Sequence, residues 1–391
     1  MNSPAPQGIV IVGGGLAAVR TAQMLRSLGC AEPIAMFSEE SVAPYDRPPL
    51  SKDFLTGTID EGRLALLTAS AIDELGLNIH LNSRATRLDR ARRSLEFADG
   101  RTLRYGKLVI ATGARARRLP GLGGSPRIHY LRSADNARAL AAALETARRI
   151  VVVGSGFIGL EVASSARELG IDVEVVAADG GPMIGVVGKV LSDWLTALHA
   201  ANSVPITSAI AVTGVEETPS SVVLHTRDGA ARSADLVLVG AGISRELHWL
   251  AVAGLEVHDG LVCDRQGRTA DPHIFGAGDI ACVHDEFGCQ PIGHWTAAAD
   301  SARRAAHAIM DVADHDADED GFFWTEQHGH RLQFVGSAAL DADATVISGS
   351  LDSGKFVAEL HSSGQLTGVF GSNSPREFLK SRLSFGRTAQ C

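Results

Sequence analysis

The run IVIVGGGLAA, residues 9–18, decides the fold of this chain. Its first four residues are apolar and β-branched, which is typical of a buried strand in a parallel sheet. Gly13 then permits a tight turn, Gly15 lets the backbone approach a pyrophosphate, and the small Ala18 lets the next helix pack closely on the strand. The run therefore predicts a strand–turn–helix unit that binds a dinucleotide.

The run IVVVGSGFIG, residues 150–159, repeats this pattern 141 residues later, with Gly154, Gly156 and Gly159 at the three small positions. Each motif would open a helix whose free N–H groups and positive dipole end attract phosphate. One such motif could be an ordinary turn in a parallel sheet. Two of them, each after a strand-like run, indicate two nucleotides bound side by side, an arrangement suited to passing electrons from one cofactor to the other.

The composition is that of a soluble globular protein with two or three domains. The chain has 391 residues, of which 45% are hydrophobic and 21% are charged. No apolar run is long enough to span a bilayer, and residues 1–6 lack the features of a secretory signal, so we expect a cytoplasmic protein without a membrane partner. A net charge of −9 disfavours nucleic acid as a partner, because such binding depends on many Lys and Arg contacts to phosphate.

The cysteines are Cys30, Cys263, Cys282, Cys289 and Cys391. They form no C-x-x-C pair, and no spacing among them suggests zinc or an iron–sulfur cluster, so no metal site is expected. An odd number without a disulfide framework is typical of a reducing cytoplasm.

Two features after the first motif carry candidate charges. Glu39 follows the strand-like run 34–37 and lies 26 residues after Gly13, near the position where an acid binds a ribose hydroxyl; an exposed acid without a ligand is the alternative. The loop 43–52 contains two adjacent prolines, which exclude helix up to Leu50 and stiffen the loop. A stiff loop is well suited to positioning one charged side chain.

The remaining pattern alternates strands and helices. We expect helices over 17–28, around Leu75, over 296–310 and from Pro375, and strands over 78–81, 103–105, 107–110, 234–239, 332–334, 344–347, 356–360 and 366–370. Strand-to-glycine ends occur at 111–113, 240–242 and 274–279, the last with an acid. The acidic run 311–320 is interpreted as a linker.

Nearly the whole chain resembles the FAD-dependent, NADH-using ferredoxin reductases of bacterial oxygenase systems, a group that includes putidaredoxin, rubredoxin and biphenyl-dioxygenase ferredoxin reductases. The segments that carry the resemblance are PYDRPPLSK at 44–52, GLEVA at 159–163, GAGD at 276–279 and FWTEQ at 323–327.

The resemblance implies an α/β, glutathione-reductase-like fold with two Rossmann-type dinucleotide-binding domains and a small C-terminal α+β domain. An FAD-binding domain would comprise residues 1–114 and 241–318, and an NAD-binding domain residues 115–240. The C-terminal domain would comprise residues 319–391.

The resemblance also assigns site residues. Those that would contact FAD are Gly13, Gly15, Leu16, Ala17, Ala18, Glu39, Arg47, Lys52, Ala85, Thr112, Gly113, Arg132, Gly278, Asp279 and Trp295. Those that would contact NAD are Gly154, Gly156, Phe157, Ile158, Gly159 and Asp179. In this arrangement Asp279 would bind the ribityl chain and Trp295 would lie at the pyrimidine edge of the flavin, although a core aromatic is an equal interpretation of Trp295.

Lys52 and Glu161 are the expected catalytic pair. The resemblance implies that Lys52 lies beside the reactive face of the isoalloxazine and pairs with Glu161. Physically, an isolated charge in a dry pocket is costly, so each needs the other, and a cation would stabilise negative charge that develops as hydride arrives. The alternative is a solvated loop lysine and a helix-surface acid.

The chain departs from the family at the NAD ribose. The strand after the second motif usually ends in Glu, with Arg four residues later, whereas this chain has Ala177 and Gly181. Asp179 is a possible substitute for the acid. No Arg or Lys lies between Arg167 and Lys189, so no 2′-phosphate pocket is apparent either. We expect NADH as the donor, with NADPH left open.

The implied activity is that of a flavoprotein oxidoreductase that passes electrons from NAD(P)H through FAD to a small [2Fe–2S] ferredoxin, which feeds an oxygenase. The segment after Glu39 has no cysteine, although flavin disulfide and peroxide reductases need one beside the flavin. A rubredoxin reductase, an NADH oxidase and a binding flavoprotein like apoptosis-inducing factor remain alternatives. The chain could act as a monomer or a homodimer.

Overall fold

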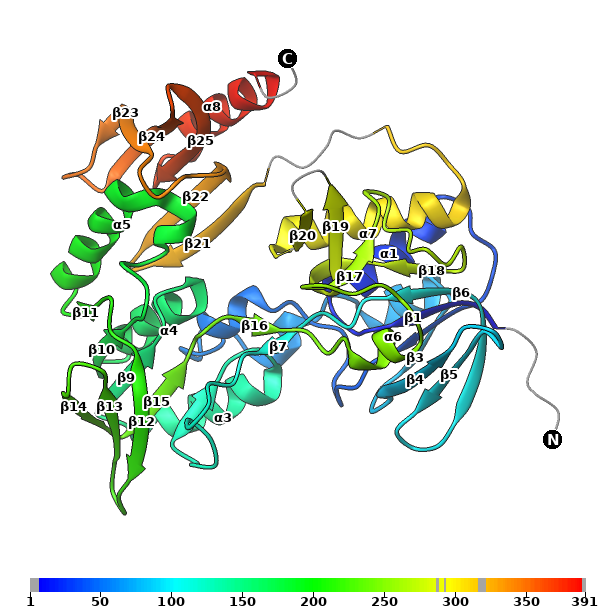
Figure 1. The fold of residues 1–391 in the computed structure, drawn as a ribbon, viewed down its shortest axis with the longest axis horizontal. Coiled ribbons are helices and arrows are strands. Elements are labelled where there is room, and N and C mark those ends of the chain that lie inside the picture. The colour runs from blue at the N-terminus through cyan, green and yellow to red at the C-terminus, as the bar shows by residue number, and fades with distance from the viewer. Residues whose placement is uncertain (1–6, 286–287, 292, 316–320, 389–391) are drawn as a thin grey trace. The chain divides into compact units, whose positions relative to one another are not determined.

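The first glycine motif lies at the carboxyl end of a central strand in the computed structural model (Figure 1). The structure describes residues 7–285, 288–291, 293–315 and 321–388. They divide into unit 1, which comprises Met1–Asp46, Gly62–Arg115 and Ser244–Glu319, and unit 2, which comprises Arg47–Glu61, Ala116–Ile243 and Asp320–Cys391. Each unit is described by itself.

Unit 1 is built on one mixed sheet. Its parallel part has the order β3-β2-β1-β6, with β18 also parallel to β6, and β4 and β5 extend it in antiparallel fashion from the start of β6. These strands are β1 (Gln7–Val12), β2 (Ile34–Phe37), β3 (Leu77–His80), β4 (Ala85–Asp89), β5 (Ser94–Phe97), β6 (Thr102–Ile110) and β18 (Ile274–Gly276). The smaller elements of unit 1 are α2 (Ala69–Glu74), α6 (His248–Val252), β17 (Leu261–Cys263), β19 (Ala281–Asp285) and β20 (Gly288–Pro291).

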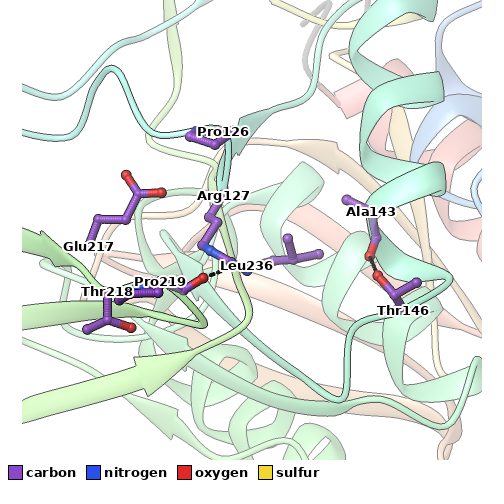
Figure 2. A pocket seen from close by; sticks show the side chains of 8 residues that line it. All are labelled: Pro126, Arg127, Ala143, Thr146, Glu217, Thr218, Pro219 and Leu236. Carbon is purple, nitrogen blue, oxygen red and sulfur yellow. Dashed lines mark hydrogen bonds between the residues drawn. The ribbon is translucent and has the colours of Figure 1, made fainter.

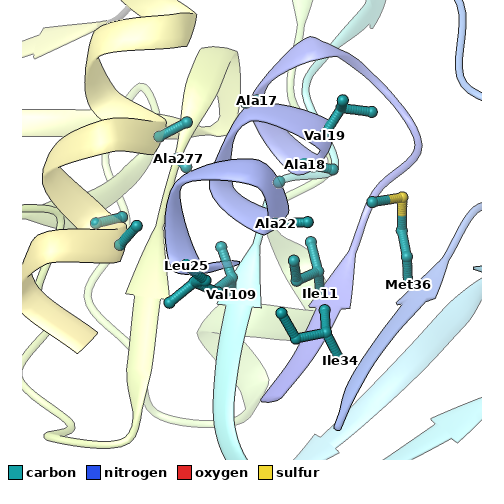
Figure 3. Packing of buried hydrophobic residues seen from close by; sticks show 14 of the residues in the cluster. Ile11, Ala17, Ala18, Val19, Ala22, Leu25, Ile34, Met36, Val109 and Ala277 are labelled. Atoms are coloured by element: carbon teal, nitrogen blue, oxygen red, sulfur yellow. The ribbon is translucent and has the colours of Figure 1, made fainter. Parts of the chain in front are cut away.

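Two alanine-rich helices, α1 (Leu16–Ser27) and α7 (Trp295–Met310), share the core of unit 1 with this sheet. Figure 3 shows Ala22 of α1 beside Ile11 of β1, and Ala18 belongs to the same buried cluster. Ala302 and Ala305 of α7 are fully buried in the same cluster. Because alanine is small, the helix backbones approach closely, and this fixes the start of α1 against the glycine turn.

Unit 2 contains a second parallel sheet of order β11-β10-β9-β15-β8. Its elements are β8 (Ile128–Tyr130), α3 (Ala134–Leu144), β9 (Arg149–Val153), α4 (Phe157–Glu168), β10 (Asp172–Val176), α5 (Ile184–Ala201), β11 (Ile206–Thr207) and β15 (Leu236–Val239). A three-stranded antiparallel sheet follows β11 and consists of β12 (Val212–Glu217), β13 (Val222–Thr226) and β14 (Ala231–Ala234). Two of the passages of the chain between the units fall within β7 (Arg115–Ala116) and β16 (Ile243–Ser244).

The C-terminal part of unit 2 is an antiparallel sheet of order β21-β22-β25-β24-β23. Its elements are β21 (Phe323–Gln327), β22 (His330–Gly336), β23 (Asp343–Ser350), β24 (Lys355–Ser362), β25 (Gln365–Ser372) and α8 (Pro375–Thr388). Phe378 of α8 is buried against Val335, Val357 and Val369 of the sheet. Phenylalanines of the opposite face pack with Leu191 and Leu195 of α5, so this sheet and α5 share a core.

Two expectations about local structure are corrected, and a third is only partly covered by the described residues. Pro48–Ser51 form a 3₁₀ helix, because proline is tolerated in a first helical turn, where its missing N–H has no partner to lose. The helix expected around Leu75 ends at Glu74, with Leu75 as its C-cap. The acidic run 311–320 lies partly outside the described residues, since 316–320 are not described.

The cysteines only partly follow expectation. Cys30 and Cys263 are free and buried, whereas Cys282 is disulfide-bonded, which contradicts the expected lack of disulfides. Burial raises the pKa of the Cys263 thiol to about 12, so it is inert as a nucleophile. No described helix is both long and apolar enough to cross a bilayer.

Candidate functional site

The first glycine of each motif is required by a close backbone approach. Gly13 has φ of +141°, and a Cβ there would lie 2.1 Å from the carbonyl oxygen of Ala111. Gly154 has φ of +107°, and its Cβ would lie 2.4 Å from the oxygen of Gly240. A side chain would therefore strain the turn and push away the neighbouring strand end. Both turns have the construction that the sequence predicts.

The middle glycines border open space. Gly15 and Gly156 are the N-caps of α1 and α4, with extended backbones, and a Cβ on either would meet no atom within 4 Å. Neither helix start has a side-chain cap, so the first N–H groups are available to a ligand. An anion such as a pyrophosphate fits this combination of space, donors and positive dipole end. The residues of both motifs therefore fit a dinucleotide.

The third position differs between the motifs. In unit 1 it is the fully buried Ala18, whereas in unit 2 it is Gly159, where a Cβ would lie 2.3 Å from the oxygen of Gly154. Leu16 and Ala17 start α1, and Phe157 and Ile158 start α4, as expected.

Asp279 lies near the start of α1. It follows β18 in a short 3₁₀ helix, Gly278–Ile280, and is half-buried. Gly278 has φ of +72°, its N–H donates to Ser301 Oγ at 2.9 Å, and a Cβ on it would lie 2.7 Å from that of Ala17. The fold thus brings the predicted acid and the first motif together, although they are more than 250 residues apart in sequence.

Other predicted residues of unit 1 lie at strand ends or at helix starts. Thr112 and Gly113 follow β6, and the half-buried Ala85 begins β4. Trp295 begins α7, and its indole Nε1–H donates to Asp46 Oδ1 at 2.8 Å. This hydrogen bond fixes the indole on the loop that contains the PYDR segment.

Glu39 is exposed after β2 and is paired with arginine. Arg115 Nη2 donates to Glu39 Oε2 at 2.6 Å, and Arg115 Nε lies 2.9 Å from Glu246 Oε1. Arg84 lies 3.9 Å from Glu39 and 3.0 Å from Glu246. Glu39 is therefore part of a surface ion cluster in which a ribose hydroxyl would have to compete for its oxygens.

Two predicted arginines and the predicted catalytic pair lie in unit 2. Arg47 donates from Nη1 to the backbone oxygen of Arg132, so these two residues are neighbours. Lys52 Nζ lies 3.1 Å from Glu161 Oε1, and their side chains are only 15% and 6% exposed. The alternative of a solvated lysine and a helix-surface acid is therefore wrong as a description of their environment.

Glu161 also accepts hydrogen bonds that the sequence pattern does not reveal. Ser51 Oγ donates to Oε2, Thr325 Oγ1 donates to Oε1 at 2.7 Å, and the N–H of Glu326 donates to Oε1 at 3.4 Å. These donors and the Lys52 ammonium group give the carboxylate oxygens the partners that a buried ion pair needs, which makes burial of this pair tolerable. The FWTEQ segment at 323–327 was the available signal for Thr325.

A pair of histidines adjoins this site. His199 is fully buried, and its Nδ1 lies 3.0 Å from Nε2 of the half-buried His328. Burial lowers the pKa of both rings, and the nearby His199 and His330 lower that of His328 further, to about 4. Both histidines are therefore neutral at pH 7.

We expect the protein to lose stability between about pH 6.5 and about pH 4. The folded pKa of His328 lies below its unfolded value, so the unfolded chain binds more protons in this range and acid favours it. At pH 5 the loss from His328 is about 1 kcal/mol, after allowance for solvent screening of a partly exposed ring. Urea unfolding at pH 7 and pH 5 measures this loss. His328→Asn should reduce it, and replacement of the exposed His248 should not; an undiminished loss in His328→Asn would assign it to other groups.

The NAD ribose position lacks a buried acid. Ala177 is 1% exposed, and Asp179 is exposed two residues later, where its backbone oxygen accepts from Ala209 N at 2.7 Å. Glu174 of β10 is occupied by arginines, with Arg232 Nε at 2.7 Å and Arg149 Nη2 at 3.1 Å. The only exposed acid close to the end of β10 is therefore Asp179, within the described segment 172–181.

A hollow of about 630 Å³ in unit 2 contains none of the predicted site residues. Figure 2 shows Arg127 and Leu236 lining it, with the Arg127 guanidinium donating to the oxygen of Pro219 at 3.1 Å. These residues precede β8 or begin β15, so the hollow lies at the amino ends of the parallel strands. Nucleotides bind at the carboxyl ends, where Gly154 lies. Among the described residues, no group of three His, Cys, Asp or Glu is arranged to bind a metal ion.

Comparison with known proteins places the chain in a family. Residues 7–306 match the pyridine nucleotide-disulphide oxidoreductases, and residues 322–391 match the reductase C-terminal family. The chain belongs to the pyridine nucleotide-disulphide oxidoreductase family. A member of this family is an oxidoreductase that uses FAD and a pyridine nucleotide, and the expectation of these two cofactors is confirmed.

Three relatives narrow the comparison. The chain is 35% identical to the rhodocoxin reductase of Rhodococcus erythropolis, covering 96% of this chain and 88% of the relative. It is 36% identical to the rubredoxin–NAD(+) reductase of Pseudomonas putida, covering 87% and 89%. The crystal structure of a covalent putidaredoxin reductase–putidaredoxin complex matches with a TM-score of 0.91 at 30% identity, covering 98% and 93%. The predicted fold class and family resemblance are confirmed.

Proposed function

We propose that this chain is an NADH:ferredoxin reductase that supplies electrons to an oxygenase. Two glycine cradles, which we define as the open spaces beside Gly15 and Gly156 at the starts of α1 and α4, support this most strongly. They occur in a chain whose relatives are named rhodocoxin and rubredoxin reductases. The first cradle would bind FAD and the second NADH. Accordingly, residues 1–114 and 241–318 would form the FAD-binding domain, residues 115–240 the NAD-binding domain, and residues 319–391 the C-terminal domain.

The chemistry that the bound cofactors supply is hydride transfer from nicotinamide to flavin, followed by release of single electrons. The protein's own contribution is positioning and electrostatics. Lys52 would place a buried cation where negative charge develops, and Glu161 would fix the direction of its ammonium group. Cys30 and Cys263 are buried, and the Cys263 thiol is held in its neutral form, so neither is suited to act as a redox thiol.

The acceptor would be a small [2Fe–2S] ferredoxin in the cytoplasm, met by a reductase that is a monomer or a homodimer. The putidaredoxin complex of a 30% identical reductase, together with relatives named as ferredoxin–NAD(P)(+) and ferredoxin–NAD(+) reductases, supports a ferredoxin partner. The rubredoxin relative keeps a rubredoxin acceptor as the alternative.

Anaerobic titration of the purified flavoprotein with NADH, followed by a panel of acceptors, tests the proposal. We expect bleaching of the flavin by one equivalent of NADH and rapid reoxidation by a [2Fe–2S] ferredoxin. Rubredoxin and oxygen serve as the competing acceptors. Reoxidation by oxygen as fast as by any iron–sulfur protein would overturn the electron-transfer role, and failure to bleach with NADH or NADPH would overturn the donor.

Asp179 is proposed to bind the NADH ribose in place of the absent strand-end acid. We expect Asp179→Ala to raise KM for NADH about 10-fold with kcat nearly unchanged, because a charge-assisted hydrogen bond contributes about 1.5 kcal/mol. KM for NADPH should change little, so the ratio of kcat/KM for NADH to kcat/KM for NADPH should fall. Steady-state kinetics with both donors measure this, with the exposed Asp172→Ala as control. An unchanged KM for NADH would remove Asp179 from the site.

A further inference from the structure

A continuous hydrogen-bonded chain connects His328 with Glu161 inside unit 2. His328 Nε2 lies 3.0 Å from His199 Nδ1, and His199 Nε2 lies 3.0 Å from Gln327 Oε1. Gln327 Nε2 donates to Thr325 Oγ1 at 3.3 Å, and Thr325 donates to Glu161 Oε1 at 2.7 Å. His199 comes from α5, whereas Thr325, Gln327 and His328 come from β21 and its end.

The direction of donation along this series of hydrogen bonds follows from the side-chain amide of Gln327. Gln327 donates from Nε2, so its Oε1 must accept, and His199 is therefore protonated on Nε2. His199 Nδ1 then accepts from the Nε2–H of His328. Every donor in the chain points toward Glu161, and the Thr325 hydroxyl has its one hydrogen directed at that carboxylate.

We propose that His199, acting through Gln327 and Thr325, is a positioning residue for the Lys52–Glu161 pair. The inference rests on the proposed function, because the pair's role in hydride transfer is part of it. A free threonine hydroxyl can rotate and donate elsewhere, whereas one that already accepts from Gln327 is held with its hydrogen on Glu161. A fixed Glu161 in turn fixes the Lys52 ammonium group, which it contacts at 3.1 Å.

Burial makes this arrangement rigid. His199, Thr325 and Gln327 are each at most 1% exposed, so water cannot replace a lost partner. Lowered pKa values keep both imidazoles neutral, so the chain supplies aligned dipoles and adds no cation that would compete with Lys52 for Glu161. The Gln327 amide does not relay protons readily. We therefore infer that this series of hydrogen bonds positions Glu161 and does not transfer protons to it.

A matched pair of substitutions separates the loss of the hydrogen bond to Gln327 from the loss of the imidazole ring itself. His199→Gln can place an N–H donor where Nε2 lies and so retain the bond to Gln327, whereas His199→Asn is shorter and cannot. We expect His199→Asn to lower the rate constant of flavin reduction at saturating NADH about 10-fold, with the NADH dissociation constant unchanged. His199→Gln should remain within about 2-fold of wild type. A loss of one buried hydrogen bond of 1–1.5 kcal/mol corresponds to a change of about 10-fold.

A double-mutant cycle gives the decisive comparison. In a Glu161→Gln background, His199→Asn should have no further effect on flavin reduction, because the group that it positions is already changed. Equal slowing by His199→Asn and His199→Gln, or an undiminished effect in the Glu161→Gln background, would overturn the proposal. Thr325→Val and Thr325→Ser form a second matched pair, used if His199→Asn fails to fold by circular dichroism.

Nitrogen-15 NMR of histidine-labelled full-length protein supplies a readout independent of turnover. We expect His199 as the Nε2–H tautomer, with a slowly exchanging imidazole proton whose resonance shifts in Thr325→Val. An Nδ1–H tautomer of His199, or a resonance insensitive to Thr325→Val, would contradict the proposed hydrogen bonding from His199 through Gln327 to Thr325. If wild-type flavin is not reduced by NADH, the proposed function fails while this NMR test still decides the hydrogen-bonded chain.

Discussion

Glu161→Ala is expected to slow flavin reduction by NADH about 100-fold, the scale on which one preorganised electrostatic group contributes to a rate. The physical reason is that Lys52 would lose its only described anionic partner while remaining 85% buried. Its ammonium group would then turn toward solvent, and the cation would be withdrawn from the place where negative charge develops. Stopped-flow spectroscopy under anaerobic conditions measures the rate directly.

The same substitution should destabilise the fold by about 3 kcal/mol, since removal of one partner of a buried ion pair leaves the other uncompensated. Lys52→Ala should also slow flavin reduction, but Glu161 would keep its bonds from Ser51 and Thr325. Glu168→Ala is the matched control, because this acid lies at the exposed end of the same helix. Unchanged reduction rates in both Glu161→Ala and Lys52→Ala would remove the pair from the mechanism.

The sequence could predict the elements whose causes are local. A Cβ on Gly13 or Gly154 would lie within about 2.5 Å of a backbone oxygen at the end of the neighbouring strand, so each position requires glycine. The glycine pattern in the sequence is therefore a direct consequence of this turn geometry. The Lys52–Glu161 contact, by contrast, joins residues 109 apart and was available only through a family resemblance. Physical argument from burial could say that each needed a partner, without saying which one.

Other parts of the site could not be predicted because they depend on how distant elements pack. His199 lies on α5 with no motif around it, and its importance arises only when β21 brings Gln327 within 3.0 Å. The ion cluster of Glu39 with Arg115 is equally invisible in a sequence, since surface arginines have many potential partners. The prolines at 48–49 led to a wrong prediction that helix is excluded up to Leu50, because their fixed φ also suits a first helical turn.

Gly156→Ala is expected to raise KM for NADH about 100-fold while the protein keeps its full complement of FAD. The Cβ would enter the space that no protein atom occupies within 4 Å, at the start of α4, where the pyrophosphate of the second nucleotide is proposed to bind. Gly156 has an extended backbone that alanine adopts without strain, so the fold should lose less than about 1 kcal/mol. Flavin absorbance gives the FAD content, and steady-state kinetics give KM.

Gly15→Ala is the reciprocal experiment in unit 1 and should yield folded protein that has lost FAD, because Gly15 has the same extended backbone and the same open space. Gly214→Ala in β12 controls for the added methyl group, since its Cβ would also meet no atom within 4 Å and β12 belongs to a sheet that contains neither motif. The two variants together separate the cradles: loss of FAD in Gly156→Ala, or retention of FAD in Gly15→Ala, would mean that the two nucleotides had been assigned to the wrong turns. Gly159→Ala would be a poor substitute, because its Cβ would lie 2.3 Å from a backbone oxygen and the turn itself would shift.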